Sequence, residues 1–556
     1  MFQPSRHPQR THPNPDATDP LAGPAISGAG MPPVEAAPPP RPALLRVMPG
    51  LNADGSLRTG KLAGLSMTMA IVTLSWPILA ESFLQSLVGL TDTFLAAHIS
   101  EAATDAIGGA SYILWFVGLV AMAISVGATA LVSRAVGGSR MAVAHAATGQ
   151  TMILAVVAGI ATGALVASVA GPMSTVMNMT GEAAQGFRVY IRICAVGVPA
   201  LSILAAGIAC ARGAGDSLRP LLAMTVVNIV NMAFAWALSG VDLSSTRLVG
   251  GEWVRTTILE NPFSLDLGIE GIAWGTVIGE YVGALMVVLF LIRGSSVVRL
   301  KRSRLRPHWH TMRRLVAVGL PNFFETLGMW AGNFLIILMV GWLTVTAGGS
   351  LAPDGSASTG GLMGAHIVAI RIEAFSFLPG FAMGAAAATL AGQYLGAGSP
   401  ISARRAVKRC TLVTVALMGA AGIAFVLVPR FIVSLISGQP THLEQVPTLI
   451  FITGLVQIPF GIGIVLRSAL RGAGDAKVVM WLTWISTYLV RLPLAYACSG
   501  VDIPLPQWLG GGVLDNPFHD SPSLWMLWVG LCGEIVIRAF LFGGRYLHGG
   551  WLKVRV

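Results

Sequence analysis

The sequence predicts an all-α polytopic membrane protein. It should have twelve transmembrane helices in two six-helix bundles, related by a pseudo-two-fold axis along the membrane normal. Composition is the first reason: of the 556 residues, 54% are apolar and only 11% are charged. A soluble globular protein carries roughly 25% charged residues. So few charges cannot cover a soluble protein of this size, and the lipid bilayer is therefore the first expected partner.

An internal repeat is the second reason. The second half of the chain repeats four short motifs of the first half in the same order, at separations of 254 to 260 residues. These are Arg-Gly-Ala-Gly-Asp at 212–216 and 471–475, Ser-Gly-Val-Asp at 239–242 and 499–502, Asn-Pro-Phe at 261–263 and 516–518, and Gly-Glu at 279–280 and 533–534. Two similar halves in an apolar chain are typical of transporters in which two bundles rock about a central pathway.

Apolar stretches follow one another after residue 60, and a helix of about 20 residues is long enough to span a bilayer. Because each half holds six of these stretches, the two halves share one orientation, as in transporters with parallel repeats. The first six predicted spans lie near 66–98, 106–135, 142–176, 185–211, 218–240 and 268–293. The second six lie near 312–343, 363–395, 403–436, 447–470, 477–500 and 524–546.

The chain divides into four predicted segments. Residues 1–60 form a Pro-rich cytoplasmic tail that we expect to be disordered, since thirteen prolines fall in its first fifty positions. Residues 61–299 form the N-terminal six-helix bundle, 300–310 a basic cytoplasmic linker, and 311–556 the C-terminal six-helix bundle. The long loops 241–267 and 501–523 are expected to form small caps or short interfacial segments.

The net charge of +11 is concentrated in short basic loops, such as 299–306 and 404–409, that alternate with acidic ones. This asymmetry follows the positive-inside rule and places both termini in the cytoplasm and the protein in the inner (plasma) membrane. The basic loops lack interleaved aromatic residues, so nucleic acid is not an expected partner. The five cysteines stand singly, with no CxxC pair, so no metal site is expected. We expect a monomer.

Ionisable residues inside the spans are the best candidates for function, because charge is costly in hydrocarbon without a partner or water. In the first span, Glu81 and Asp92 fall on one helix face, and Pro77 is predicted to kink that helix and act as a hinge. A bending helix with two carboxylates suits a site that binds and releases a cation. The alternative for Asp92 is an acid near the outer interface. The amides of Asn228 and Asn231 in the fifth span can offer oxygen to an ion next to Asp92.

The second half differs from the first at these positions. Pro321, the second predicted hinge, and Glu325 repeat the Pro-x-x-x-Glu spacing, but Ile336 stands where the first half has Asp92. Ion coupling is therefore expected in the N-terminal bundle.

The second half instead has a polar site of its own, formed by Glu325, Arg371, Glu373 and Arg491. We expect Arg491 or Arg371 to pair with Glu373 or Glu325, in a structural role more than in direct transport. Glu280 and Glu534 occupy equivalent positions in the two halves, and their duplication also favours a structural role.

The two Gly-Ala-Gly-Asp turns are not phosphate-binding loops, because no Lys-Ser/Thr follows and no strand precedes them. The sequence has no HExxH, GxSxG or CxxC pattern. We therefore predict a transporter powered by an ion gradient and not an enzyme, with H⁺ or Na⁺ as the coupling ion and no cofactor. An intramembrane enzyme is a remote alternative.

Several motifs together resemble the multidrug and toxic compound extrusion (MATE) family. They are the Gly-x-Gly-Asp turns after the fourth and tenth spans, the segment 392–398 that closes the eighth span, and its first-half counterpart 132–137. Pro77 followed by Asp92 is similar to the kinked first helix of DinF-like members, so the chain resembles these more than NorM-like members. The resemblance covers roughly 61–550.

The resemblance implies a V-shaped pair of bundles that exports organic cations, including lipophilic drugs, in exchange for H⁺ or Na⁺ by alternating access. It places the ion site around Asp92 and Asn228, with Thr276 as a further candidate. The second acid of DinF-like members is replaced by Met232, and Glu81 is the candidate substitute. A related two-bundle flippase for lipid-linked saccharides is the main alternative, which an arginine-lined central wall would favour.

Overall fold

The computed structural model describes residues 50–177, 179–249, 252–263, 265–294, 297–346, 362–436, 440–504, 511–518 and 522–554. All of these belong to one compact unit, Met48–Val556. Residues 1–49, which make up most of the predicted tail, lie outside the described residues.

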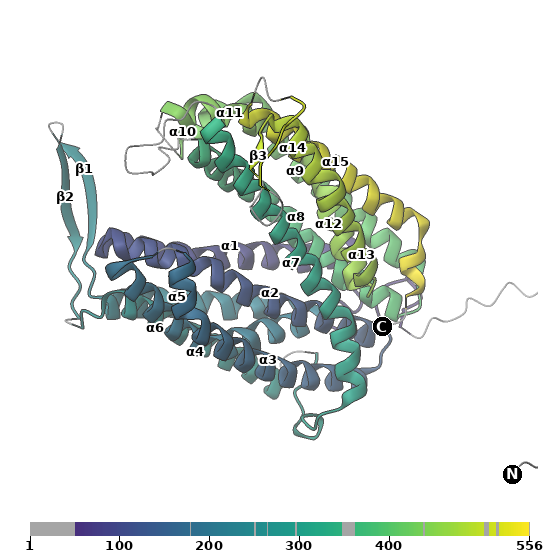
Figure 1. The fold of residues 1–556 in the computed structure, drawn as a ribbon. Coiled ribbons are helices and arrows are strands. Elements are labelled where there is room, and N and C mark those ends of the chain that lie inside the picture. Colours follow the sequence, from purple (N-terminus) through teal and green to yellow (C-terminus); the bar gives the residue numbers. More distant parts are fainter. Residues whose placement is uncertain are drawn as a thin grey trace, which may run out of the picture. The chain divides into compact units, whose positions relative to one another are not determined.

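The first bundle confirms the six predicted spans (Figure 1). Each helix is long enough and apolar enough to cross a membrane. Pro77 lies inside the first of them, which continues through it as one helix. The helices are α1 (Met67–Ile99), α2 (Glu101–Gly137), α3 (Met141–Val176), α4 (Gly181–Gly213), α5 (Leu218–Ser239) and α6 (Gly268–Arg293).

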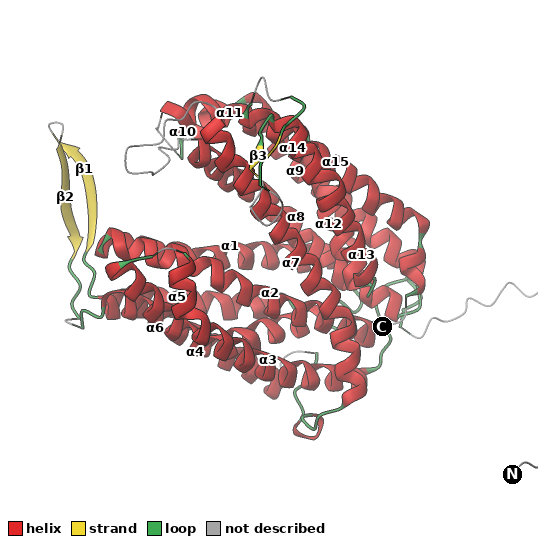
Figure 2. Cartoon of the chain, viewed as in Figure 1, coloured by secondary structure: helices red, strands yellow, loops and turns green. Residues whose placement is uncertain are grey.

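The second bundle also contains six spans, but some of them are assembled from shorter pieces (Figure 2). In the described residues eleven helices can cross a membrane, or twelve when the pair α11 and α12, bent by 59°, is counted as one span. The linker contains one 3₁₀ turn, Arg302–Arg304. The helices are α7 (Trp309–Thr346), α8 (Leu362–Gly396), α9 (Pro400–Leu427), α10 (Pro429–Ser434), α11 (Pro440–Leu455), α12 (Gln457–Gly472), α13 (Ala476–Trp484), α14 (Leu492–Ser499) and α15 (Leu524–His548).

A π-helical turn, Ile485–Arg491, joins α13 to α14 within a single span. Leu492 donates its amide hydrogen to the Thr487 carbonyl five residues earlier, as a π-helix requires. Pro493 gives the physical reason, because it has no amide hydrogen and its ring displaces the carbonyl four residues before it. The repeat-equivalent helix α5 has Ala233 at this position and is a regular α-helix.

Two β-hairpins occupy the long loops in which small caps were expected. In the first, β1 (Leu243–Val249) pairs antiparallel with β2 (Glu252–Leu259), and in the second, β3 (Ile503–Pro504) pairs with β4 (Val513–Leu514). The repeated motifs close both hairpins in the same way. The carboxylate of Asp242 accepts from the amide of Asn261, and that of Asp502 accepts from the amide of Asn516, each at 2.7 Å.

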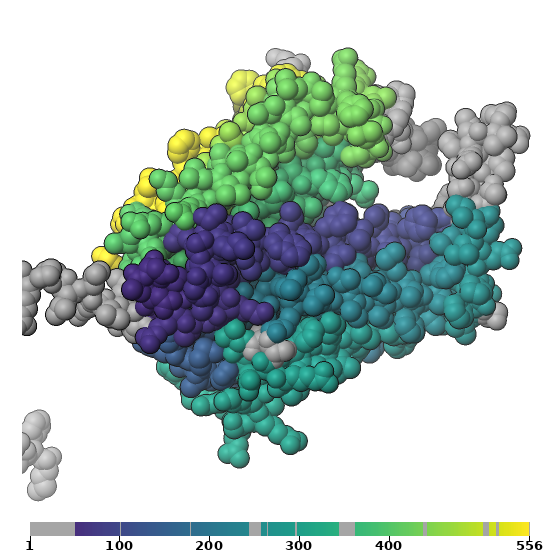
Figure 3. Space-filling model, turned by 180° about the vertical axis from the view of Figure 1, so that it is seen from behind, coloured from purple at the N-terminus to yellow at the C-terminus, as the bar shows by residue number. Residues whose placement is uncertain are grey.

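The two bundles meet where α2 crosses the end of α8. A methyl group on Gly137 would collide with the backbone of Gln393, and one on Gly396 would collide with the backbone of Arg134. These repeat-equivalent glycines therefore allow the closest approach of the two bundles. Arg134 reinforces the contact, since its Nη2 donates to the Ala473 carbonyl at 2.7 Å. From this contact the bundles diverge toward the end that carries β1 and β2 (Figure 1), where open space separates α1 from the second bundle in Figure 3.

Residues 50–60 differ from the sequence-based expectation. Residues 50–60, assigned above to the disordered tail, belong to the fold, because Leu57 is buried in the core of the second bundle together with Leu62. The same segment also contacts the first bundle, where the Thr59 hydroxyl donates to the Val136 carbonyl at 2.6 Å. Leu57 and Leu62 supply the apolar contacts that hold this segment against the core.

Candidate functional site

Asp92 lies at the centre of a buried polar cluster in the first bundle. Its carboxylate Oδ2 accepts from the Tyr190 hydroxyl at 2.8 Å and from the Thr276 hydroxyl at 3.0 Å. The Thr276 oxygen in turn accepts from Asn231 Nδ2 at 2.8 Å. Asp92 is only 4% exposed, and the four residues come from α1, α4, α5 and α6. The structure thus brings together the predicted residues Asp92, Asn231 and Thr276.

Small residues on α6 make this cluster possible. A methyl group on Gly275 would collide with Ala235 of α5, and one on Gly279 would come within 3.2 Å of the Asn231 side chain. Because these glycines flank Thr276, α5 and α6 can approach closely enough for the Asn231 to Thr276 hydrogen bond. The local sequence of α6 therefore sets the geometry around Asp92.

Two buried amide oxygens of α5 have no hydrogen-bond donor among the described residues. Asn228 donates its Nδ2 to the Met224 carbonyl at 2.9 Å, and its Oδ1 is buried without a partner among the described residues. The Oδ1 of Asn231 is in the same situation. A buried oxygen normally accepts a hydrogen bond, so these two oxygens are available to a bound cation.

Tyr190 and Glu280 complete the surroundings of Asp92. Tyr190 is not among the predicted site residues, and its signal in the sequence is a phenol hydroxyl inside an apolar span. Glu280 follows Thr276 by one turn on α6 and packs against Gly197 of α4. In the described part of the chain its carboxyl has no hydrogen-bond or ion-pair partner, and it lies within electrostatic range of Asp92. Its repeat partner Glu534 differs, because it forms an ion pair with Arg538 at 2.7 Å.

Glu81 does not join the Asp92 cluster. It forms an ion pair with Arg212 at 2.6 Å and lies eleven residues before Asp92, roughly 16 Å along the helix. The second bundle repeats this pair, since Glu325 contacts Arg471 at 2.6 Å. In each bundle the acid stands four residues after a helix proline, Pro77 or Pro321. The role of these prolines as hinges stays a prediction.

The predicted partners of Glu325 are wrong. Neither Arg491 nor Arg371 reaches it; instead Arg471 and Arg467, one turn apart on α12, both contact it, and Thr483 donates to its Oε1 at 2.8 Å. The reason is that α13 packs against α7, while the two long arginine side chains reach Glu325 from α12. Helix periodicity alone does not specify such neighbours.

The other predicted members of the second-bundle site are more loosely associated. Arg371 is exposed on α8. Arg491 lies within electrostatic range of both Glu373 and Glu534, but within the described ranges it forms no ion pair at contact distance with either. Its Nε is buried without a hydrogen-bond partner among the described residues.

Two arginines that sequence analysis missed converge beside this site. Arg467 of α12 and Arg538 of α15 each direct an Nη1 to the sulfur of Met329, at 3.5 and 3.7 Å. Arg538 also donates to Thr487 in the π-helical turn at 3.2 Å. Both arginines were present in the sequence as charges inside predicted spans, which was the available signal.

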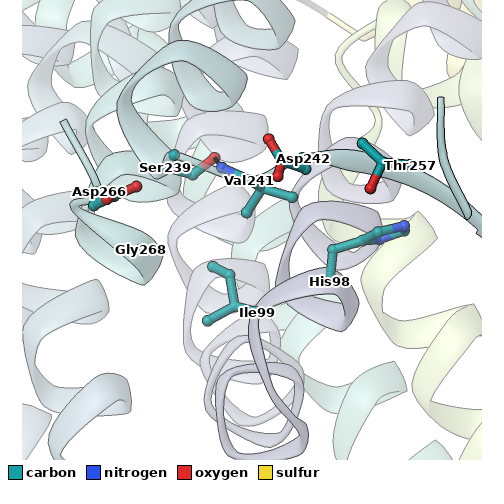
Figure 4. Close-up of a pocket in the computed structure, with 9 residues that line it drawn as sticks. His98, Ile99, Ser239, Val241, Asp242, Thr257, Asp266 and Gly268 are labelled. Carbon is teal, nitrogen blue, oxygen red and sulfur yellow. Dashed lines mark hydrogen bonds between the residues drawn. The ribbon is translucent and has the colours of Figure 1, made fainter. Parts of the chain in front are cut away.

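A separate pocket of about 350 Å³ lies at the end of α1 beyond Asp92 (Figure 4). His98 and Ile99 of α1, Asp242 of the turn before β1, Thr257 of β2 and Asp266 before α6 contribute to its wall. His98 follows Asp92 by six residues, roughly 9 Å along the helix. The pocket is therefore close to the Asp92 cluster but distinct from it.

Two repeated bundles of membrane-spanning helices, with buried polar clusters where helices cross, define the class of polytopic membrane transporters. The chain belongs to the MatE family, whose model matches residues 77–237 and 356–497. The predicted resemblance to MATE efflux transporters is thereby confirmed, as is the prediction of a transporter and not an enzyme.

Curated relatives cover most of the chain. A probable multidrug resistance protein NorM of Thermotoga maritima is 24% identical over 490 residues, which is 87% of this chain and 93% of the relative. The multidrug resistance protein PmpM of Pseudomonas aeruginosa is 23% identical over 441 residues, 78% of this chain and 84% of the relative. The closer similarity to DinF-like members stays a prediction.

Solved structures share the fold. An outward-facing multidrug resistance MATE transporter superposes with a TM-score of 0.73 at 18% identity, covering 88% of this chain and 97% of that one. A MATE structure in a bent conformation has a TM-score of 0.72 at 18% identity, covering 88% and 96%. These matches confirm the two-bundle architecture.

Proposed function

We propose that this chain is a cation-coupled antiporter that exports lipophilic organic compounds, organic cations among them, by alternating access. The observation that carries the proposal is the Asp92 cluster. Among the described residues this carboxylate, which lies inside a membrane-spanning bundle, is bound only by the neutral groups of Tyr190 and Thr276. Ionisable residues inside membrane spans mark ion pathways. The names of the curated relatives, which are multidrug resistance proteins, support the export of drugs.

Two coupling ions are compatible with this cluster. A proton needs only the Asp92 carboxylate and a second site for transfer, which Glu280 supplies from α6, one helical turn after Thr276. Sodium needs several oxygen ligands, and the open Oδ1 atoms of Asn228 and Asn231 add to those of Asp92, Tyr190 and Thr276. We keep H⁺ and Na⁺ as alternatives that one experiment separates.

The position of α1 supports coupling between the ion and the substrate. This helix packs against α5 and α6 of its own bundle and also against α8 of the second bundle. A change in its shape when Asp92 binds a cation is therefore transmitted across the space between the bundles. Bending at Pro77 is the expected form of that change.

The test is transport in proteoliposomes that contain the full chain and a fluorescent lipophilic cation such as ethidium. A pH gradient and a Na⁺ gradient are imposed one at a time. Asp92→Asn should abolish gradient-driven transport, whereas Asp105→Asn, an exposed acid of the same bundle, should not. Undiminished gradient-driven transport by Asp92→Asn would refute the assigned coupling site.

The flippase alternative receives support from one observation, the arginines of the second bundle. Lipid-linked saccharides carry a diphosphate, which arginine binds well. In the same proteoliposomes, transfer of a fluorescent prenyl diphosphate between leaflets without an ion gradient would favour the flippase over the antiporter.

A further inference from the structure

We propose that the second bundle contains an anion-binding site formed by Arg467, Arg491 and Arg538, which takes a carboxylate or phosphate group of an amphiphilic substrate. The inference rests on the proposed export function, because it specifies a chemical feature of the exported molecule. It predicts that zwitterionic compounds bind better than purely cationic ones of the same shape.

Comparison of the two repeats shows that these arginines are not part of the common scaffold. The ion pair Glu81–Arg212 of the first bundle and the pair Glu325–Arg471 of the second occupy equivalent positions. One acid–arginine pair in each bundle therefore belongs to the architecture that the two repeats share. The three arginines of the proposed site are additions in the second bundle. Their counterparts in the first bundle are uncharged, namely Ile208, Asn231 and Ala284.

The added arginines are incompletely neutralised. Glu325 is shared between Arg471 at 2.6 Å and Arg467 at 3.0 Å, so one carboxylate serves two guanidinium groups. Glu534 is taken by Arg538. Arg491 makes no ion pair at contact distance in the part of the chain described here, and its Nε is buried without an acceptor. Glu373 and Glu534 lie only within electrostatic range of Arg491, so four arginines (Arg467, Arg471, Arg491 and Arg538) share three acids (Glu325, Glu373 and Glu534). Buried positive charge in excess of its carboxylates is costly, and a bound anion would relieve that cost.

Met329 marks the position at which the anion would bind. The Nη1 atoms of Arg467 and Arg538 come from two different helices and both end on its sulfur. A thioether is a weak acceptor, whereas carboxylate and phosphate oxygens form strong charge-assisted bonds with guanidinium groups. The methionine side chain is flexible and can move aside.

The site is accessible and is shaped by the π-helical turn. The side chains of Arg467 and Arg538 are 16% and 13% exposed, so a ligand can reach them. The turn Ile485–Arg491 carries Thr487, which accepts from Arg538, and ends in Arg491. Single π-helical turns within α-helices frequently occur at functional sites. The equivalent helix of the first bundle, α5, is a regular α-helix without such a turn, so the turn is not required by the shared scaffold.

The binding test uses two dyes that differ only in one carboxylate. Rhodamine B is a zwitterion, and in its ethyl ester the carboxylate is blocked while the cationic ring system is unchanged. Fluorescence polarisation with the purified full chain should give roughly tenfold tighter binding of rhodamine B, about 1.4 kcal/mol. Equal affinity for the two dyes would overturn the proposal.

Variants at Met329 test the position without removing an arginine. Met329→Glu places a tethered carboxylate between the guanidinium groups and should abolish the preference for rhodamine B. Met329→Gln, which has the same length without the charge, should retain it. Arg467→Gln with Arg538→Gln should also lose the preference, whereas Arg430→Gln, an exposed arginine of α10, should keep it. A preference that survives in Met329→Glu would contradict the assignment.

Two further arms separate the sources of the anion and the two proposals. Displacement of rhodamine B by farnesyl diphosphate but not by farnesol would assign the site to a lipid phosphate, and displacement by a soluble carboxylate drug alone would assign it to exported compounds. Asp92→Asn should leave the dye preference unchanged. A variant that loses transport but keeps the preference for rhodamine B is therefore impaired at the coupling site only. A variant that keeps transport but loses this preference is impaired at the arginine site only.

Discussion

At the scale of single residues, the Tyr190 hydroxyl is the group that most directly stabilises an ionised Asp92. It donates to the carboxylate from α4, and a hydrogen bond to a charged group contributes about 1.5–3 kcal/mol. We expect Tyr190→Phe to shift the half-saturating concentration of the coupling ion roughly tenfold, measured from the ion dependence of transport in proteoliposomes. The shift is downward for H⁺, because a less stabilised carboxylate holds its proton more tightly, and upward for Na⁺, which loses an oxygen ligand. Tyr281→Phe is the matched control in the same bundle, because its hydroxyl donates to the Val196 carbonyl and not to Asp92. Equal effects of the two substitutions would contradict this role.

Glu280 and Glu534 are equivalent in sequence but should respond differently to the same substitution. Glu534→Gln leaves the buried Arg538 without its carboxylate, and breaking such a pair costs about 3–5 kcal/mol. Glu280→Gln breaks no ion pair, so we expect little loss of thermal stability but impaired ion-driven transport. Melting of the purified variants and transport assays measure the two effects. If Glu280→Gln melts as early as Glu534→Gln, Glu280 has a structural role instead.

At the scale of helices and turns, the sequence predicted the spans well because long apolar stretches and their repeats are local signals. It did not predict the π-helical turn or the bend between α11 and α12. The bend lies just before Pro459, yet Pro199 at the equivalent place leaves α4 continuous. A proline removes a hydrogen bond in either helix. Tertiary packing then decides whether the helix breaks, and the local sequence does not predict that packing.

The glycine crossing between α2 and α8 gives a prediction at the same scale. A side chain at Gly137 cannot be accommodated while the bundles touch, because it would meet the backbone of Gln393. Gly137→Ala should therefore shift the population toward a state with the bundles separated at this end. Distances between spin labels on α2 and α8 would measure the shift. Gly118→Ala is the control on α2, since a methyl group there meets nothing within 4 Å. An unchanged distance distribution in Gly137→Ala would show that the close contact at Gly137 does not control the separation of the bundles.

At the scale of the whole molecule, the repeat specified the scaffold but not the partners of its charges. The spacing from Pro77 to Glu81 and from Pro321 to Glu325 indicated equivalent acids, and the repeated turn indicated equivalent arginines. Their pairing as Glu81–Arg212 and Glu325–Arg471 depends on the arrangement of whole helices within each bundle. Helix periodicity defines the face on which a residue lies. It does not define the neighbour that covers this face, which is why the arginines that pair with Glu325 were not predicted.

The segment 50–65 links the two bundles and should influence their equilibrium. Leu57 and Leu62 are buried in the core of the second bundle, while Thr59 and the Lys61 amide bond to carbonyls of the first. Separation of the bundles at this end requires these contacts to break. Leu57→Ala with Leu62→Ala removes apolar contacts worth about 2–5 kcal/mol each, so the separated state should become more populated, measured by the same spin-label distances. Leu51→Ala, at a residue that only packs against the edge of this core, should have a smaller effect. Equal populations in the double variant and the unmodified chain would show that the segment follows the movement of the bundles without biasing it.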